Sequence, residues 1–300
     1  MAEGTRLLSE YGEKSPSRVR IPPSPFLLQT AVGGPSGTSL DVGRTHEMSV
    51  LDSFRLDGRV AIVTGASSGL GVAFARGLAQ AGADVAICAR RADRLQQTRQ
   101  EVEAEGRRCV AVEADVATVE DCARVVERTT SELGRVDILV NNAGVGTAVP
   151  ATREAPEDFR RVIDINLMGS YWMAQACARA MTDGGSIINI GSVLGSTTAG
   201  LPQAAYSSSK AAIIGLTRDL AQQWTGRKGI RVNALAPGFF PSEMTEQYPE
   251  GYLDQMMWRV PAGRVGRPEE LVAALVFLAS DASSYVTGVV LPVDGGVLTT

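Results

Sequence analysis

The sequence predicts an α/β fold, in which helices cover both faces of a doubly wound, parallel, seven-stranded sheet in a single domain. Two observations support this prediction. From residue 60 onward, seven short apolar runs alternate with stretches of helical length. The first run, Val60–Val63, is continuously apolar, which is typical of a strand buried on both faces. Strands and helices that alternate in this way imply right-handed crossovers and parallel strands.

The loop after the first strand predicts a binding site for a pyrophosphate. It connects Val60–Val63 to an amphipathic helix that runs to about Ala81. Glycines in such a loop let the backbone turn tightly and approach phosphates at the helix N-terminus, where free N–H groups and the helix dipole favour anions. The loop residues assigned to nucleotide binding are Gly65, Ser67, Ser68, Gly69, Leu70 and Gly71.

The end of the second strand favours NADP over NAD. This strand spans about Asp84 to Cys88 and is followed by Ala89, Arg90 and Arg91. An acidic residue at this point would accept hydrogen bonds from the ribose of NAD, whereas alanine cannot and arginines pair with a phosphate. The alternative is that both arginines only cap the strand end in water, so NAD stays possible.

The middle of the chain continues the alternation of helices and strands. Asp115 follows the third strand; it can accept a hydrogen bond from an adenine amino group, with Val116 beside it, or it can cap the next helix. The four predicted elements are the helix 92–105, the strand 109–113, the helix 119–133 and the strand 137–140.

Asparagines end the fourth strand, where a doubly wound sheet has its ligand crevice. The segment is Asn141-Asn142-Ala143-Gly144. Two adjacent asparagines can hydrogen-bond neighbouring loops and keep the floor of the crevice in shape. A plain turn is the competing interpretation, because Asn and Gly are both turn residues.

A helix opening at residues 204–212 contains a pair of side chains suited to proton transfer. Tyr206 and Lys210 are four residues apart, so on a helix they lie on one face. A positive charge near a phenol favours the phenolate and lowers the phenol's pKa toward neutrality. Without other motifs, the bland interpretation is a surface helix that carries Tyr and Lys by chance.

Taken together, these motifs resemble the short-chain dehydrogenase/reductase family in its compact, single-domain form with a Rossmann fold. The resemblance covers about residues 55–300. It implies an oxidoreductase that interconverts a secondary alcohol and a ketone by hydride transfer with NADP or NAD, and no metal at the reaction centre. The motifs that carry it are Thr64-Gly65-x-x-x-Gly69-x-Gly71, Asn141-Asn142-Ala143-Gly144, Ser192 and Tyr206-x-x-x-Lys210.

The resemblance also implies four catalytic residues. Asn166, in a long helix of about residues 156–182, matches the asparagine that holds a water in the proton path. Ser192, after the strand 186–190, matches the serine that hydrogen-bonds the substrate oxygen. Tyr206 would transfer the proton, while Lys210 would assist it and bind the nicotinamide ribose. Asn142, Ala143 and Gly144, with Tyr206 and Lys210, complete the implied cofactor contacts in this half of the site.

The last third of the chain matches the family's loop beside the nicotinamide. This loop follows the strand 230–235, and its implied cofactor contacts are Pro237, Gly238, Phe240 and Ser242, with Ser242 where a threonine is more usual. Residues 243–261, which include Met244 and Tyr248, resemble a lid over the substrate. A helix from Pro268 and a strand at 289–293 complete the pattern. In relatives this C-terminal end and the two long helices, here at about 156–182 and 204–226, form subunit interfaces. The resemblance therefore implies a homotetramer, with a dimer as the runner-up.

Residues 1–52 differ from everything after them. They are rich in Ser, Pro and Gly and show no sustained periodicity, which predicts a disordered or loosely packed extension before a catalytic domain at 53–300. Met48 is a candidate alternative start. The net charge of −4 and a pI near 5.3 argue against a nucleic-acid binder. No run reaches the ~20 apolar residues of a membrane span.

The remaining composition predicts a cytoplasmic enzyme that acts on a small molecule. Four cysteines show no CxxC pair, and His46 is the only histidine, so the cysteines are interpreted as reduced packing residues. A second class of function stays open, namely a nucleotide-binding sensor or scaffold that kept the fold and lost the reaction. The substrate itself is not predicted, because one fold serves many substrates; the segments 88–91 and 237–244 look most like gluconate 5-dehydrogenases and 3-oxoacyl reductases.

Overall fold

The structure is a computed structural model that describes residues 49–243, 245 and 250–300. The chain divides into two units, residues 1–46 and 47–300, and all the described residues belong to the second. Most of the predicted N-terminal extension, with Met48, lies outside the described residues. Its last residues form part of a short 3-10 helix, Val50–Phe54, which the Ser49 side chain caps. The predicted boundary between residues 52 and 53 stays a prediction.

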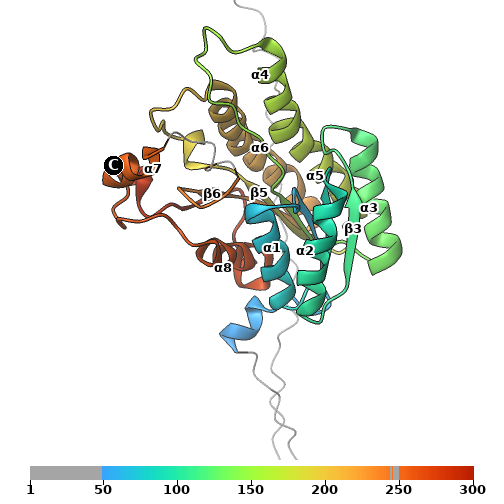
Figure 1. Ribbon diagram of the computed structural model, residues 1–300. Coiled ribbons are helices and arrows are strands. Elements are labelled where there is room, and N and C mark those ends of the chain that lie inside the picture. Colours follow the sequence, from blue (N-terminus) through green and yellow to red (C-terminus); the bar gives the residue numbers. More distant parts are fainter. Residues whose placement is uncertain (1–48, 244, 246–249) are drawn as a thin grey trace, which may run out of the picture. The chain divides into compact units, whose positions relative to one another are not determined.

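In the part of the chain that the structure describes, seven strands form one parallel sheet in the order β3-β2-β1-β4-β5-β6-β7 (Figure 1). The predicted fold class is therefore confirmed. The strands are β1 (Val60–Thr64), β2 (Asp84–Ala89), β3 (Cys109–Glu113), β4 (Ile138–Asn141), β5 (Gly185–Ile190), β6 (Ile230–Pro237) and β7 (Val290–Val293).

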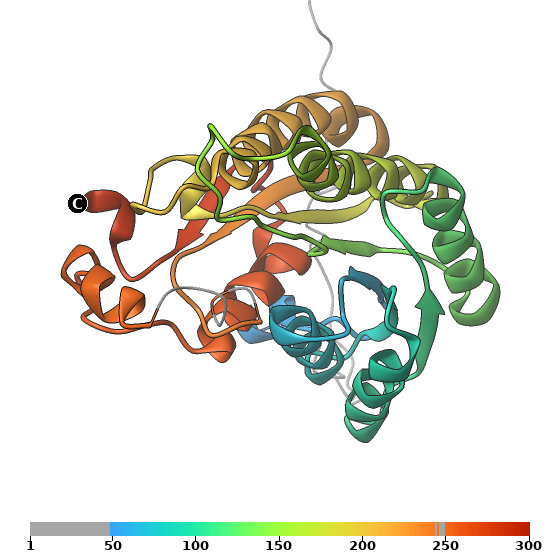
Figure 2. The same ribbon diagram turned by 45° about the horizontal axis from the view of Figure 1, so that its top comes forward.

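Helices cover both faces of the sheet, as Figure 2 shows edge-on. Successive strand side chains point to opposite faces, so Ile62 packs into one apolar cluster and Val63 into the other. One face carries α3 (Val119–Leu133), α5 (Gly169–Ala180) and α6 (Ala204–Lys228), and the other carries α1 (Gly69–Gln80), α2 (Ala92–Ala104) and α8 (Pro268–Ala279). Two shorter helices, α4 (Pro156–Ile163) and α7 (Tyr252–Met256), complete the described α-helices.

The strand order places a crevice between β1 and β4. These strands are neighbours, with Val63 beside Val140, but their connections leave toward opposite faces of the sheet. At such a switch point the two loops separate and leave a crevice at the carboxyl ends of the strands. The glycine loop and the asparagine segment therefore flank one crevice.

The predicted long helix at 156–182 is interrupted in the structure. Helix α4 ends at Ile163, one π-helical turn follows at Asp164–Met168, and α5 begins at Gly169. Within the π turn, the Asn166 side chain bonds the backbone of Val145 in another loop. A π turn inserts an extra residue into a helix and often occurs at functional sites. Sequence periodicity could not reveal the π turn, because Val145, the partner of Asn166, lies 21 residues away in the chain.

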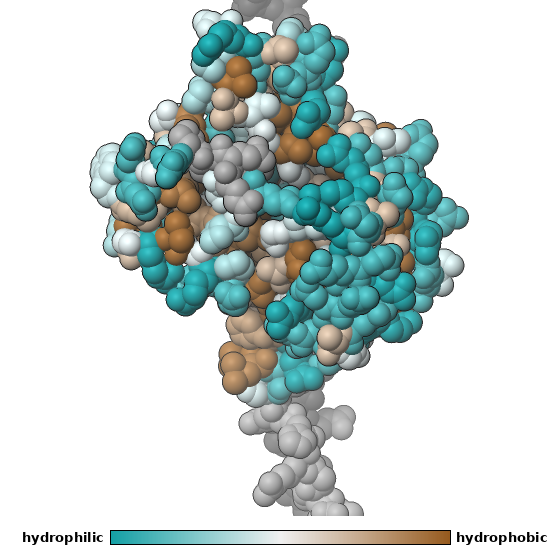
Figure 3. Space-filling view, in the orientation of Figure 1, coloured by the Kyte–Doolittle hydropathy of each residue, from teal (hydrophilic) through white to brown (hydrophobic). Residues whose placement is uncertain are grey.

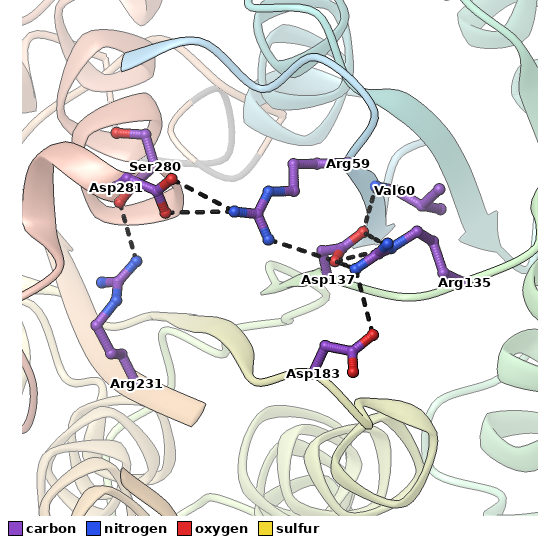
Figure 4. A network of polar contacts seen from close by, with 8 residues as sticks. All are labelled: Arg59, Val60, Arg135, Asp137, Asp183, Arg231, Ser280 and Asp281. Atoms are coloured by element: carbon purple, nitrogen blue, oxygen red, sulfur yellow. Dashed lines mark hydrogen bonds and ion pairs between the residues drawn. The ribbon is translucent and has the colours of Figure 1, made fainter. Parts of the chain in front are cut away.

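The opposite end of the sheet is held by a network of charged side chains (Figure 4). Asp137 is buried; it accepts a hydrogen bond from Val60 N at 2.9 Å and pairs with Arg135 Nη2 at 2.7 Å. Arg59 reaches both Asp137, at 3.6 Å, and Asp281, at 3.4 Å. The network therefore ties the start of β1 to the start of β4 and to the segment after α8, far from the crevice.

The surface in the orientation of Figure 1 is mostly hydrophilic over α2 and α3, with an apolar patch at the lower edge over the 3-10 helix Val50–Phe54 (Figure 3). Val50 and Leu51 are its most exposed apolar side chains. None of the helices that the structure describes is long and apolar enough to cross a membrane.

Candidate active site

One cavity of about 470 Å³ lies at the carboxyl ends of the strands and collects nearly all the predicted site residues. Every predicted cofactor contact lines it, as do three of the four predicted catalytic residues; Asn166 lies just behind it. These lining residues are Gly65, Ser67, Ser68, Gly69, Leu70, Gly71, Arg90, Arg91, Asp115, Val116, Asn142, Ala143, Gly144, Ser192, Tyr206, Lys210, Pro237, Gly238, Phe240 and Ser242. The size suits a small organic ligand.

Two glycines of the loop have no room for a side chain. A Cβ on Gly71 would lie 2.3 Å from Gly65 O, and one on Gly65 would lie 2.7 Å from Ala143 Cα. Gly65 also has a φ of 67°, which is costly for other residues. Glycine at these positions lets the loop, the start of α1 and the β4 segment pack together, so the N-terminus of α1 faces the cavity. The arrangement fits the pyrophosphate of a dinucleotide.

The loops after β1 and β4 are joined by Thr64, which the sequence analysis placed in the glycine motif without giving it a role. Its hydroxyl accepts hydrogen bonds from Asn142 N and Ala143 N, both at 3.0 Å. In return, Asn142 Nδ2 donates to Thr64 O at 2.9 Å and to Gly65 O at 3.2 Å. The prediction that asparagines of this segment bond a neighbouring loop is confirmed. A threonine at a strand end carries no signal of this role, because its partners lie 78 residues away.

Arg90 and Arg91 are both exposed residues that line the cavity, and Arg91 is hydrogen-bonded to the glycine loop. The Arg91 Nε and Nη2 atoms lie 3.2 and 3.0 Å from Ser67 Oγ, and Nη2 lies 2.7 Å from Ser68 Oγ. A guanidinium beside two hydroxyls is a suitable donor set for a phosphate. This geometry places Arg91 in the cavity rather than merely at a strand end in water.

Asp115 lies on the wall where an adenine would be expected. Its Oδ1 accepts a hydrogen bond from Ala117 N at 3.0 Å, which closes a local turn before α3. Its own backbone N–H donates to Asp121 Oδ2 at 2.8 Å. The carboxylate therefore serves the local turn and lines the cavity at the same time.

Ser192, Tyr206 and Lys210 all line the cavity. Ser192 follows β5, and its Oγ accepts a hydrogen bond from Leu194 N at 3.1 Å. That bond uses a lone pair, so the hydroxyl proton can still be donated. Tyr206 and Lys210 are buried on one face of α6, with Lys210 Nζ 5.6 Å from the centre of the Tyr206 ring. The predicted pairing of these two side chains on one helix face is confirmed.

The Lys210 amine is held deep in the protein. Its Nζ donates to Ile190 O, at the end of β5, at 2.7 Å. Burial lowers the pKa of Lys210 from 10.5 to about 8. A lysine with this pKa exchanges its proton at pH values close to neutral, and strongly perturbed pKa values of this kind are common at functional sites.

Replacing this lysine should change how stability depends on pH. Between about pH 8 and pH 10.5 the unfolded lysine holds a proton that the folded one has released. The unfolded state then binds more protons, so the contribution of Lys210 to stability rises with pH across this window. We expect the free energy of unfolding of the wild type, minus that of Lys210→Met, to increase from pH 7.5 to pH 9.5. Urea titrations at both pH values check this. A constant difference would contradict the lowered pKa.

Asn166 is fully engaged with protein groups. Its Oδ1 accepts from Val145 N at 2.8 Å, while its Nδ2 donates to Val145 O and to Ser209 Oγ, both at 2.9 Å. The side chain therefore fixes the segment after β4 against α6, beside the predicted catalytic pair. These contacts give the side chain a positioning role; that Asn166 holds a water stays a prediction.

The loop after β6 closes the remaining side of the cavity. Ser242 N donates to Thr245 Oγ1 at 2.8 Å, and both residues line the cavity. Tyr252, at the start of α7, is buried and donates its hydroxyl hydrogen bond to Ala199 O, in an apolar cluster that also holds Tyr206. The described part of the predicted lid thus packs beside the reactive end of the cavity. Met244 and Tyr248 lie outside the described residues.

Comparisons with known proteins agree with this geometry. A family profile described as enoyl-(acyl carrier protein) reductase matches residues 65–298. The chain is 39% identical to 2-dehydro-3-deoxy-D-gluconate 5-dehydrogenase of Escherichia coli (strain K12), over 83% of this chain and 99% of the relative. It is 40% identical to the 3-oxoacyl-(acyl-carrier-protein) reductase FabG of Thermotoga maritima, over 81% of this chain and 99% of the relative.

A solved structure extends the similarity to three dimensions. The crystal structure of a gluconate 5-dehydrogenase from Burkholderia cenocepacia J2315, in complex with NADP and tartrate, has a TM-score of 0.80 and 38% sequence identity. The match covers 84% of this chain and 100% of that one.

Proposed function

The chain belongs to the short-chain dehydrogenase/reductase family, and on this premise we propose that it is an NADP-dependent oxidoreductase that interconverts a secondary alcohol and a ketone. The observation that carries the proposal is that Ser192, Tyr206 and Lys210 line the same cavity as the glycine loop. A nucleotide site and a proton-transfer pair on one cavity are what hydride transfer to a carbonyl needs.

The side chains have separate tasks in the proposed reaction. When bound, the nicotinamide would supply or accept the hydride. In the reduction direction, the Ser192 hydroxyl donates to the carbonyl oxygen and stabilises the charge that develops there. Tyr206 gives the proton to that oxygen, and the Lys210 ammonium favours the phenolate that remains. General acid–base assistance of this kind is typically worth ~10²–10⁴-fold in rate.

The residues around Arg91 support NADP as the cofactor. Arg91, Ser67 and Ser68 form a cationic, hydroxyl-rich corner on the wall of the cavity. Ala89 at the end of β2 provides no carboxylate, so a 2′-phosphate is not repelled from that position. NAD remains the alternative cofactor. The related gluconate 5-dehydrogenase of known structure binds NADP.

Arg91→Gln should weaken NADPH binding at least about tenfold and leave NADH binding nearly unchanged. The reason is that a hydrogen bond to a charged group is worth ~1.5–3 kcal/mol, and 1.4 kcal/mol is a factor of ten. Isothermal titration calorimetry with both nucleotides measures the two Kd values. Arg99→Gln is the matched control, because Arg99 lies on α2, which begins directly after Arg91, but pairs with Glu103 on the surface. An equal loss of affinity for both nucleotides would mean that Arg91 has a structural role.

The reaction itself is tested with a panel of substrates. Purified protein is mixed with NADPH and with NADP, and absorbance at the nicotinamide band is followed with ketones, sugar acids, 3-oxoacyl thioesters and secondary alcohols. We expect turnover with at least one class, and a faster rate with NADP(H) than with NAD(H). If the protein binds NADPH but turns over no member of the panel, the nucleotide-binding sensor is the better interpretation.

We also propose that the protein is a homotetramer, with a dimer as the alternative. Phe159 on α4 is 38% exposed beside an apolar groove next to α6, and Val289 next to β7 is 39% exposed. These positions match the elements that the family resemblance implies as subunit interfaces. Light scattering after size exclusion should give about four times the 31.6 kDa mass of the chain.

A cytoplasmic location completes the proposal. The four cysteines are buried and unpaired, which agrees with a reducing compartment. Cell fractionation with an antibody against the protein tests the location.

A further inference from the structure

A carboxylate from the loop after β6 is bound to Arg91, which lines the proposed cofactor site, and to Arg94 on α2. Glu243 and Arg91 form a double hydrogen bond, Nη1 to Oε1 at 3.2 Å and Nη2 to Oε2 at 3.0 Å. Ser68 Oγ donates to Glu243 Oε2 at 2.8 Å, and Arg94 Nη1 donates to Oε1. Glu243 lies 152 residues from Arg91 in the chain, so only the fold brings them together.

This carboxylate is bound in the way that a phosphate would be. The forked guanidinium of Arg91 and the Ser68 hydroxyl, which both line the cavity, converge on its two oxygens together with the guanidinium of Arg94 on α2. The hydrogen bonds from Arg91 lower the pKa of Glu243 to about 2, so the group is an anion at any physiological pH. These donors therefore form an anion-binding site, and the anion bound there is the carboxylate of Glu243.

We propose that Glu243 is a specificity-determining residue, whose carboxylate holds Arg91 and Arg94 in the nucleotide-free protein and must be displaced by the 2′-phosphate of NADP. The inference rests on the proposed function. It assigns to Glu243 a role opposite to that of the arginines, because Glu243 lowers the preference for NADP over NAD.

Charge explains why the two anions exclude each other. A carboxylate and a phosphate that share Arg91 repel each other, and Arg91 has a limited number of N–H donors. NAD has no 2′-phosphate, so it leaves the contacts of Glu243 with Arg91 and Arg94 in place. Binding of NADP has to break those contacts, while binding of NAD does not. The wild type therefore prefers NADP over NAD less strongly than it would if the two arginines had no carboxylate bound to them.

Glu243→Gln should tighten the binding of NADPH about tenfold and change that of NADH by less than about twofold. The estimate follows from two ion pairs, each half exposed and worth up to a few-fold, together with the repulsion that is removed. Titration calorimetry of the full chain measures both Kd values without turnover. The fragments 2′,5′-ADP and 5′-AMP, which differ by the 2′-phosphate, should repeat the pattern.

Two further variants separate this role from a general effect of charge. Glu103→Gln removes one negative charge from an exposed ion pair on α2, away from the cavity, and should change neither nucleotide's Kd. In an Arg91→Gln background, Glu243→Gln should increase the affinity for NADPH by a smaller factor than it does in the wild type, because the shared partner is absent.

Three results would overturn the inference. If wild type binds NADPH but Glu243→Gln binds it equally or less tightly, Glu243 orients Arg91 rather than competing for it, and the proposed function stands. If NADPH, NADH and 5′-AMP all tighten equally, Glu243 obstructs the whole cavity. If the wild type binds neither dinucleotide, the proposed function fails, and the inference fails with it.

Discussion

Tyr206→Phe should lower kcat at least ~10²-fold and leave the Kd for NADPH nearly unchanged. The substitution removes one oxygen from a side chain that lies buried in the wall of the cavity. Because the ring stays, its packing among Leu194, Phe239 and Tyr252 is kept. The loss should therefore appear in the chemical step and not in nucleotide binding.

The structure gives this tyrosine two neighbours suited to the step. Lys210 Nζ lies 5.6 Å from the centre of the Tyr206 ring, and Ser192 lines the same cavity. The cation favours the phenolate, and the serine hydroxyl is available to the substrate oxygen. Removal of the phenolic oxygen would leave both neighbours without the group to which we assign the proton transfer.

A matched control separates the chemical effect from a general effect of losing a phenol. Tyr171 lies on α5 and does not line the cavity; its hydroxyl accepts from Gln175 Nε2 at 3.4 Å. Tyr171→Phe should keep kcat within about twofold, and steady-state kinetics together with NADPH titration measure both variants. Full activity in Tyr206→Phe would remove the proton-transfer role that we propose for this residue.

Asp137→Ala should destabilise the protein by about 3 kcal/mol, since it leaves the buried Val60 N–H without its acceptor and removes charged hydrogen bonds to Arg135. Asp137 is 3% exposed and serves several groups at once. It pairs with Arg135 and Arg59, and it accepts from Val60 N at the start of β1. Without it, a buried backbone N–H loses its acceptor and the ends of β1 and β4 lose their link (Figure 4).

Asp183 is the control within the same network. It contacts Arg135 at 3.9 Å, and its side chain is 76% exposed. Asp183→Ala should lower the free energy of unfolding by less than about 0.5 kcal/mol, because solvent screens an exposed pair. Urea unfolding at one fixed protein concentration compares both variants with the wild type. Equal effects of the two substitutions would show that burial does not set the value of these pairs.

The strands were predictable because their apolar runs report local burial. The predicted strand 109–113 matches β3, and the predicted strand 137–140 differs from β4 (Ile138–Asn141) by one residue. The long helix 156–182 was predicted as one element and is instead divided by the π turn at Asp164–Met168. That turn is accompanied by contacts of Asn166 with a different loop, so it could not be read from helical periodicity.

The same distinction holds for the site. The glycine loop and the Tyr206 and Lys210 pair were predictable, because each depends on residues a few positions apart. Thr64 and Glu243 were not, since their partners lie 78 and 152 residues away. The residues next to a threonine or a glutamate in the sequence do not predict which distant loop its side chain will contact.

The amino-acid sequence by itself determined the fold class, the place of the nucleotide loop and the placement of Tyr206 and Lys210 on one helix face, because all three follow from short-range periodicity and spacing. Only the tertiary structure decided that Arg91 is hydrogen-bonded to the glycine loop and to a distant carboxylate, and that Asn166 is bonded to Val145. The reason is physical: hydrogen bonds and ion pairs depend on distances of about 3 Å, and between remote segments such distances exist only after the sheet has assembled.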